Sequence, residues 1–364
     1  MELKVIEPRI IFDTVVGSRA YGIHNPDSDS DRSGVCIPTS EYFFGFKKFE
    51  QFQSFPEKDR VSYDIRKAVS LILDNNPNMI DLLWVPDHCI VKSTPYWDIF
   101  RENRDLFLSK KCRWTFSGYA IAQLRRIESH RKFLLDPPTA APKREDFGLK
   151  DFSRFPSSQL KAVLYTSLEL IPEESNPEFY AELTAVYKDY VSPLFIKYVK
   201  DSERKLAMDW LQMAVTSQVK TLKSIAPYIK DEYLEEATNE IAYFTVAQTW
   251  KQYCEWNKTR NRARATLEAK YGFDTKHAGH LVRLLRMGVE TLQTGQVNVD
   301  RTNIDAEELK EIRNGSWSFE KLKEYSGTMD DKLTRLYETS SLKKKPKVEA
   351  VQDLLVDVVQ RYLS

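Results

Sequence analysis

The sequence has few cysteines and no long apolar run, and both absences narrow the class of protein. Its four cysteines are far apart and form no Cys-x-x-Cys pair, which argues against zinc knuckles and a dense disulfide framework. No stretch reaches the roughly 18 to 20 apolar residues that cross a bilayer. The N-terminus lacks the basic and long apolar segments of a signal peptide. We therefore expect no membrane partner and a reducing, cytoplasmic location.

An excess of charge of one sign is also missing. The chain has 54 Lys and Arg against 53 Asp and Glu, for a net charge of +1. Net charge therefore argues neither for nor against a nucleic-acid partner, and any anion-binding surface must be local. No GxxxxGK[ST] motif is present, and no GxGxxG motif follows a strand, so neither nucleotide-binding loop is supported.

The pattern of the 364 residues predicts an α+β protein. Apolar and alternating segments predict strands at 9–16, 29–38 and 59–65. Helical spacing predicts helices at 66–74, 77–84 (with Asn76 as N-cap), 108–135, across 160–271, at 275–294, two within 307–337, and one ending at 363. We expect a small mixed sheet with flanking helices at residues 1–105. A large, mainly helical region follows at 106–364.

Two closely spaced acids carry the strongest chemical indication. Asp29 and Asp31 lie where the chain enters the second predicted strand, and residues two apart on a strand point to one face. Two carboxylates facing one way need a cation between them, and oxygen-only ligation favours Mg²⁺ or Mn²⁺. Such a metal neutralises charge while a nucleotidyl group passes from a nucleoside triphosphate to an acceptor.

The turn after the first strand supplies candidate phosphate ligands. Gly17 lets the backbone approach a phosphate closely. Backbone amides at the start of the following helix, the Ser18 hydroxyl and Arg19 would hold the triphosphate. A third acid would bind the metal and act as base for the attacking hydroxyl. Asp59, at the start of the third strand, is the first candidate, and Asp64 is the fallback.

The acidic segment from Asp27 to Asp31 also has two simpler interpretations. A calcium loop beginning at Asp27 would need Gly at position 32 and Glu at position 38, but the chain has Arg32 and Pro38. A solvated turn is the second interpretation, because Asn, Pro, Asp and Ser favour turns. It suits Asp27 best and remains open for Asp29 and Asp31 when they are taken alone.

At these residues the sequence resembles the DNA polymerase beta-type nucleotidyltransferase superfamily. It is most similar to the branch of predicted nucleotidyltransferases linked to RNA repair, which carries GSxAYG and then SDxDxRGV. Here these segments are residues 17–22 (GSRAYG) and 28–35 (SDSDRSGV). Ser33 stands at the position of the family's arginine, and Arg32 falls on its variable position.

The resemblance extends beyond the first motif. Further matching segments are Asn76–Asn78 with Asp81–Trp84, Glu145–Gly148, Asp274–Ala278, His280–Leu284 and Ile312–Gly315. The resemblance implies nucleotidyl transfer from a nucleoside triphosphate, with an RNA end as the expected acceptor. The same chemistry on a protein or small molecule is an alternative, and so is a nucleotide- or nucleic-acid-binding module without catalysis.

A second cluster lies on the helix predicted at 275–294. At about 100° per residue, Lys276, His280 and Arg283 share one face of this helix. Leu281, Leu284 and Leu285 share a different face with His277. We expect a cationic stripe that closes over the triphosphate or the acceptor; a solvated basic face is the alternative.

Three further basic segments are weaker candidates for acceptor contacts. One holds Arg260, Arg262 and Arg264, with Trp256 nearby to stack a base. A second lies at 125–132, and a third, KKKPK at 343–347, is expected to be a linker. The oligomeric state is not predicted.

Overall fold

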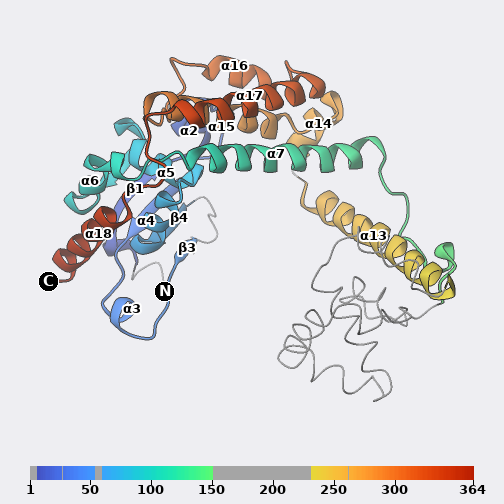
Figure 1. The fold of residues 1–364 in the computed structure, drawn as a ribbon, viewed down its shortest axis with the longest axis horizontal. Coiled ribbons are helices and arrows are strands. Elements are labelled where there is room, and N and C mark those ends of the chain that lie inside the picture. Colours follow the sequence, from blue (N-terminus) through green and yellow to red (C-terminus); the bar gives the residue numbers. More distant parts are fainter. Residues whose placement is uncertain (1–5, 27, 54–59, 151–230, 261) are drawn as a thin grey trace, which may run out of the picture. The chain divides into compact units, whose positions relative to one another are not determined.

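The computed structural model describes residues 6–26, 28–53, 60–150, 231–260 and 262–364 (Figure 1). The chain divides into two compact units, one of Met1–Leu135 with Asn261–Ser364 and the other of Asp136–Arg260. We call these the larger and the smaller unit. The domain boundary predicted between residues 105 and 106 stays a prediction.

A five-stranded mixed sheet forms the base of the larger unit, in the order β3-β4-β2-β1-β5. The strands are β1 (Ile10–Val15), β2 (Arg32–Cys36), β3 (Gln51–Gln53), β4 (Arg60–Asp64) and β5 (Ile90–Ser93). β2 runs parallel to β4, with Arg32 opposite Arg60, whereas the other neighbours are antiparallel. β1 is buried along almost its whole length because it is an inner strand with an apolar sequence.

Short helices flank this sheet. They are α2 (Gly17–Ala20), α3 (Glu41–Phe44), α4 (Ile65–Leu73), α5 (Pro77–Trp84) and α6 (Pro95–Glu102), with single turns η1 (Glu7–Arg9), η2 (Asp87–Cys89) and η3 (Arg104–Leu106). The predicted N-cap of α5 is confirmed, because the Asn76 side chain accepts a hydrogen bond from the Asn78 amide at 3.0 Å. Pro77 follows at the first helical position, where no amide hydrogen is needed.

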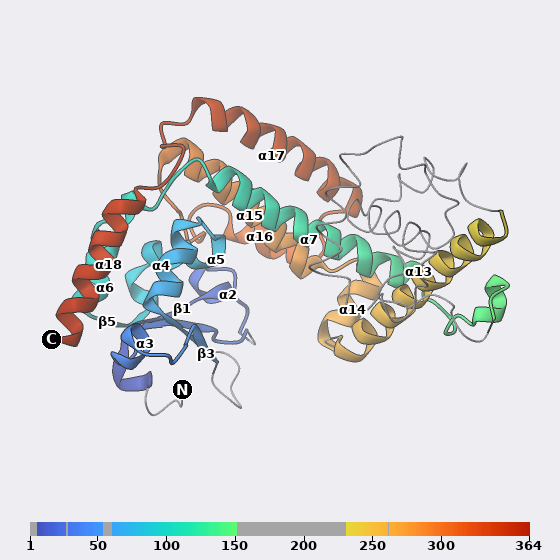
Figure 2. The same cartoon turned by 60° about the horizontal axis from the view of Figure 1, so that its bottom comes forward.

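Long helices make up the rest of the larger unit. They are α7 (Cys112–Leu135), α14 (Arg262–Tyr271), α15 (Thr275–Thr294), α16 (Ala306–Arg313), α17 (Phe319–Thr339) and α18 (Val348–Leu363). α15 packs mainly against α7 and also against α16 and α17 (Figure 2). Its leucines are buried in the core that continues to the sheet. The α+β class is therefore confirmed, with a mixed sheet followed by a mainly helical region.

Several predicted boundaries agree closely with the structure. The helix predicted at 275–294 has those bounds, and the break predicted near Gly315 separates α16 from α17. β3, β5, α3 and α6 were not predicted. In the smaller unit the structure describes η4 (Arg144–Phe147) and α13 (Asp231–Thr259), whereas the predicted helices between 160 and 230 lie outside the described residues.

Candidate functional site

A cavity of about 400 Å³ lies where the sheet meets α5 and α15 within the larger unit. We call it the central cavity. Its lining comes from the turn between β1 and α2, the start of β2, the middle of β4, α5, α15 and the end of α16. It therefore gathers segments that are nearly 300 residues apart in the chain, from Val16 to Arg313.

The turn after β1 and the start of β2 are locked together at the central cavity. The Val16 amide donates a hydrogen bond to the Asp31 carbonyl at 2.9 Å. Gly17 has a φ of +67°, a left-handed conformation that side-chain-bearing residues rarely adopt. A Cβ added at Gly17 would lie only 2.8 Å from Asp31 Oδ2. Glycine is therefore required here twice, by the backbone angle and by the close approach of the carboxylate.

Asp31 and Ser18 line the central cavity together with Gly17. Asp29 is exposed and is not among the lining residues. The expectation that both acids lie on a strand is corrected, because β2 begins at Arg32, one residue after Asp31. The two carboxylates are thus carried by the segment that leads into β2, and their joint metal binding stays a prediction.

The Arg19 side chain holds the backbone of this segment in place. Its guanidinium donates to the Ser28 carbonyl at 2.8 Å and to the Asp29 carbonyl at 3.3 Å. These bonds hold the loop that carries Asp29 against α2. Arg19 does not line the central cavity, so its predicted phosphate contact remains a prediction.

The two candidates for the third acid have different outcomes. Asp59 lies outside the described residues. Asp64 is the N-cap of α4, where it accepts bonds from the Arg66 amide at 2.7 Å and from the Arg66 guanidinium at 2.6 Å. It is buried and does not line the central cavity. The described contacts of Asp64 are therefore those of a helix cap.

A buried carboxylate that the sequence pattern did not single out lies on β1. Asp13 accepts hydrogen bonds from both Arg32, on β2, and Arg60, on β4; the Arg60 bond measures 2.7 Å. Arg32 also lines the central cavity. This cluster fixes the guanidinium of Arg32 and ties the three central strands together on one face. The Arg32 guanidinium is accommodated at the start of β2 because the Asp13 carboxylate neutralises it.

The three polar residues predicted on one face of α15 all line the central cavity. Asp274 caps the helix by accepting the His277 amide at 3.0 Å, and Lys276, His280 and Arg283 follow at helical spacing. Arg283 is only 2% exposed, which argues against the solvated basic face for this residue, and its predicted contact with the triphosphate or the acceptor stays a prediction. α15 is buried against its neighbours, so this guanidinium belongs to the interior.

Arg283 is part of a buried triad with Tyr21 and Asp81. Its guanidinium carbon lies 3.6 Å from the centroid of the Tyr21 ring. The Tyr21 hydroxyl donates to Asp81 Oδ2 at 2.5 Å. Burial raises the pKa of Asp81 to about 6, although the Arg283 charge and the Tyr21 bond oppose this rise. Burial also raises the pKa of Tyr21 well above its ordinary value. The triad connects the C-cap of α2 with α5 and α15, and its three residues line the central cavity.

His280 is held in its neutral form. Burial, reinforced by the nearby charges of Arg283, His277 and Lys276, lowers its pKa to about 3. At neutral pH it therefore adds a polar imidazole, and no charge, to the cavity wall. His277, which was predicted on the leucine face, lines the central cavity too, with Nε2 3.5 Å from Asp274 Oδ2.

Arg313 is a further lining residue with no predicted role. Its guanidinium donates to the Ile23 carbonyl at 2.6 Å, which joins the end of α16 to the loop after α2. Arg313 and the triad residues all fall in the segments that carried the family resemblance. The resemblance marked these positions, but a single sequence gave no reason to assign them contacts.

The remaining basic segments contribute no residue to the lining of the central cavity. In the smaller unit, the Arg260 guanidinium lies 4.6 Å from the Trp256 ring. The side chains of Arg262 and Arg264, which belong to the larger unit, lie outside the described residues. On α7, Arg131 donates to the Gly272 carbonyl at 3.0 Å and stacks on Phe319. Their predicted acceptor contacts stay predictions.

Two features are absent from the described residues. No group of three or more His, Cys, Asp or Glu in those ranges is arranged to hold a metal ion. Within the same ranges, no helix combines the length and apolar character that spanning a membrane requires.

A mixed sheet with a glycine turn, an adjacent acid and a covering helix is the arrangement expected of a DNA polymerase beta-type protein. Residues 2–165 match the model of RlaP, the RNA repair pathway DNA polymerase beta family. This match supports the resemblance drawn from the motifs, which is confirmed for this part of the chain.

One curated relative gives a shorter match. Over 89 residues the chain is 29% identical to the uncharacterized protein YcgL of Bacillus subtilis (strain 168), which covers 22% of this chain and 34% of the relative. The chain thus matches about a third of the length of this relative. No solved structure matches the chain.

Proposed function

We propose that the chain transfers a nucleoside monophosphate from a nucleoside triphosphate to an acceptor hydroxyl and releases pyrophosphate. The observation that carries the proposal is the contact geometry of Gly17 and Asp31 at the central cavity. A carboxylate there lies against a backbone turn that has space only for hydrogen. Lys276 and Ser18 line the same cavity and offer a cation and a hydroxyl to phosphate oxygens. The match of residues 2–165 to a DNA polymerase beta-type family supports this chemistry.

Asp29 and Asp31 fit a Mg²⁺ or Mn²⁺ site in chemical terms, because carboxylate oxygens are the ligands these ions prefer. The metal, when bound, would polarise and neutralise the triphosphate. We retain Asp59 as the proposed third acid. Its support is that Arg60, the next residue, pairs in register with Arg32, the residue after Asp31.

The reaction that these residues would support is a substitution at the α-phosphorus of the nucleoside triphosphate. The acceptor oxygen forms a bond to the α-phosphorus while the bond from that phosphorus to the α,β-bridging oxygen breaks, and pyrophosphate leaves with this oxygen. The proton of the acceptor hydroxyl passes to a carboxylate base, for which Asp59 is proposed. Gly17, Ser18 and Lys276 would orient the triphosphate, with Arg19, His280 and Arg283 as further proposed nucleotide contacts. Alignment of the reacting atoms by such contacts is itself a large part of catalysis.

An RNA end is the proposed acceptor, since the family is linked to RNA repair. The test offers each labelled nucleoside triphosphate, with Mg²⁺ or Mn²⁺, to RNA, DNA and protein acceptors, and measures pyrophosphate release in parallel. Transfer of label to RNA that Asp31→Asn abolishes supports the proposal. Asp87→Asn is the matched control, because Asp87 is an exposed acid outside the cavity lining.

The remaining outcomes distinguish the alternatives. Label on protein or on a small molecule, with the same dependence on Asp31, would keep the chemistry and replace the acceptor. Nucleotide binding without pyrophosphate release for any acceptor would favour a binding module. Equal labelling by Asp31→Asn and the wild-type chain would contradict the proposed site.

A further inference from the structure

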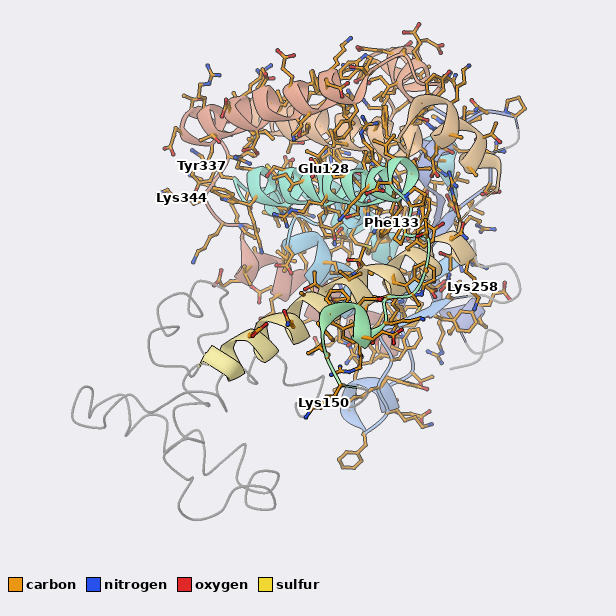
Figure 3. All side chains as sticks on the ribbon, turned by 90° about the vertical axis from the view of Figure 1, so that its right-hand side faces the viewer. Glu128, Phe133, Lys150, Lys258, Tyr337 and Lys344 are labelled. Carbon is orange, nitrogen blue, oxygen red and sulfur yellow. The ribbon has the colours of Figure 1, made fainter. Side chains whose placement is uncertain are left out.

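A second cavity, of about 510 Å³, lies on the larger unit and contains none of the candidate residues for the reaction. We call it the lysine groove. Four segments form it: the end of α4, the start of α7, the end of α17 and the loop that leads into α18. Figure 3 labels Tyr337 and Lys344, which lie close together beside the start of α7 and both line the groove.

Two basic segments far apart in the chain meet at the lysine groove. The Lys110 amide donates to the Lys343 carbonyl at 2.8 Å, and the Lys347 amide donates to the Leu106 carbonyl at 2.9 Å. The segment 343–347 is thus fixed against residues 106–110, which precede α7, and this corrects the expectation of a simple linker. The chain as a whole is almost neutral, at +1, so this concentration of lysines is a local feature.

The charges at the groove favour an anion. Lys111, Lys344 and Lys345 line it, against a single lining acid, Asp74. Asp74 pairs with Lys111 at 2.6 Å, whereas Lys344 and Lys345 are exposed. Exposed lysines contribute electrostatic attraction to phosphates at little desolvation cost.

An exposed tryptophan gives the groove a second property. Trp114 is 60% exposed, although large aromatic side chains are usually buried. Its ring centroid lies 6.0 Å from that of Tyr337. The guanidinium of buried Arg113 lies 4.8 Å from the indole, and Arg113 is itself anchored to Asp330 at 2.9 Å. The indole is therefore held in place while most of its surface stays accessible.

We propose that the lysine groove binds single-stranded RNA, with a base stacked on Trp114 and the flanking phosphates at Lys344 and Lys345. Aromatic rings combined with lysines are the means by which proteins bind unpaired nucleic acid, because every base has a π-face to stack. A duplex is a poorer fit, since its bases are already stacked on one another. The choice of RNA rests on the acceptor class in the proposed function, while the groove itself lies on a different surface.

The experiment measures the affinity of a fluorescein-labelled oligouridylate by fluorescence anisotropy, without nucleoside triphosphate or metal. Trp114→Ala should weaken binding about tenfold or more, as expected for loss of one stacked base. Lys344→Gln with Lys345→Gln should lower the slope of log affinity against log salt by about 1.4, because each single-strand phosphate contact contributes about 0.7.

Matched controls separate the groove from general surface effects. Phe46→Ala removes a fully exposed ring elsewhere, and Lys48→Gln with Lys92→Gln removes two exposed charges elsewhere. Both should leave the affinity unchanged. Thermal melting establishes that each groove variant is folded.

A crosslinking measurement keeps the proposal testable even if a variant fails to fold. Wild-type chain irradiated with 4-thiouridine RNA should be crosslinked within 109–115 or 336–348. Crosslinks only outside these segments would overturn the proposal, as would unchanged RNA affinity in folded groove variants. It is likewise overturned if anionic vesicles bind as tightly as the oligouridylate and depend equally on Trp114.

The RNA-binding measurement can be interpreted independently of the proposed catalysis. Asp31→Asn should bind the oligouridylate like the wild-type chain, because Asp31 does not line the lysine groove. RNA binding without nucleotide transfer would retain the groove and contradict the proposed function. Transfer to RNA with unaltered affinity in the groove variants would retain the function and contradict the groove.

Discussion

The central cavity and the lysine groove belong to the same unit, but they hold their charges in opposite ways. At the central cavity, Arg283 and Asp81 are buried and held by specific partners. At the groove, Lys344 and Lys345 are exposed on a loop. Buried charges are tied to fold and geometry because an unpaired one is costly. Exposed charges contribute salt-dependent attraction and little stability. Substitutions in the two places should therefore differ in both the size and the kind of their effects.

The largest effect is expected at Asp31. Asp31→Asn removes the proposed metal ligand while keeping the size of the side chain. We expect nucleotide transfer to fall about a thousandfold, equivalent to about 4 kcal/mol of transition-state stabilisation. The measurement is the rate of pyrophosphate release under saturating nucleotide. A loss of tenfold or less would mean that Asp31 is not part of the reacting centre.

Arg283 is expected to matter mainly for stability. Arg283→Met removes the cation stacked on Tyr21 and the nearby positive charge that favours ionised Asp81, and loss of a charge that compensates a buried one costs up to about 3 to 5 kcal/mol. Chemical denaturation should show this loss. Asp81→Asn in the same chain should recover part of it, because the unpaired charge is then absent. Strictly additive effects of the two changes would argue against the coupling.

Gly17 should not tolerate a side chain. Gly17→Ala places a Cβ 2.8 Å from Asp31 Oδ2 at a φ of +67°, and the backbone conformation alone costs about 1 to 2 kcal/mol. We expect both a lower melting temperature and slower transfer. Gly118→Ala is the matched control on α7, because a Cβ there meets nothing within 4 Å. That change should be neutral or slightly stabilising.

His280 is expected to make the free energy of unfolding depend on pH in the acidic range. Its pKa is about 3 in the fold against 6.5 ordinarily, so the unfolded chain takes up a proton first as the pH falls. The free energy of unfolding is therefore not lowered by His280 above pH 6.5. Between pH 6.5 and 3 it falls progressively, at about 1 kcal/mol per pH unit.

The difference in unfolding free energy between wild type and His280→Gln isolates this effect from that of Asp81. The pKa of Asp81 is raised to about 6 from 3.8, so its contribution declines as the pH rises through that interval. A pH-independent difference between the two chains would show that His280 is not buried as a neutral group.

The smallest effect is expected at Asp74. Asp74→Asn removes the acid that pairs with Lys111 at 2.6 Å. It should raise oligouridylate affinity by no more than about fivefold, because exposed ion pairs are worth less than about 1 kcal/mol. The increase should disappear at high salt. An increase that persists in high salt would indicate a rearranged groove.

Local patterns were enough to predict the elements with strong periodicity and clear ends. α15 has the bounds that helical spacing predicted, and in the structure Asp274 caps its start and Gly295 ends it in a left-handed conformation. Short elements such as β3 and α3 were missed, because three or four residues carry too little periodicity to be recognised.

The candidate site also has a part that local sequence patterns predicted and a part that depends on the packing of distant segments. The Gly17 turn and Asp31 are neighbours in sequence and in space, so one motif was sufficient to single them out. The partners of Arg283 could not be predicted, because Tyr21 and Asp81 lie more than 200 residues before it in the chain. A helical wheel also cannot distinguish a solvated face from a buried one. That distinction depends on which helices pack around α15. The same holds for the lysine groove, where the meaning of the basic segment 343–347 depends on its pairing with residues 106–110, which precede α7. The amino-acid sequence thus determined the reactive residue types and their local spacing, whereas tertiary packing determined which charges are buried, paired or exposed.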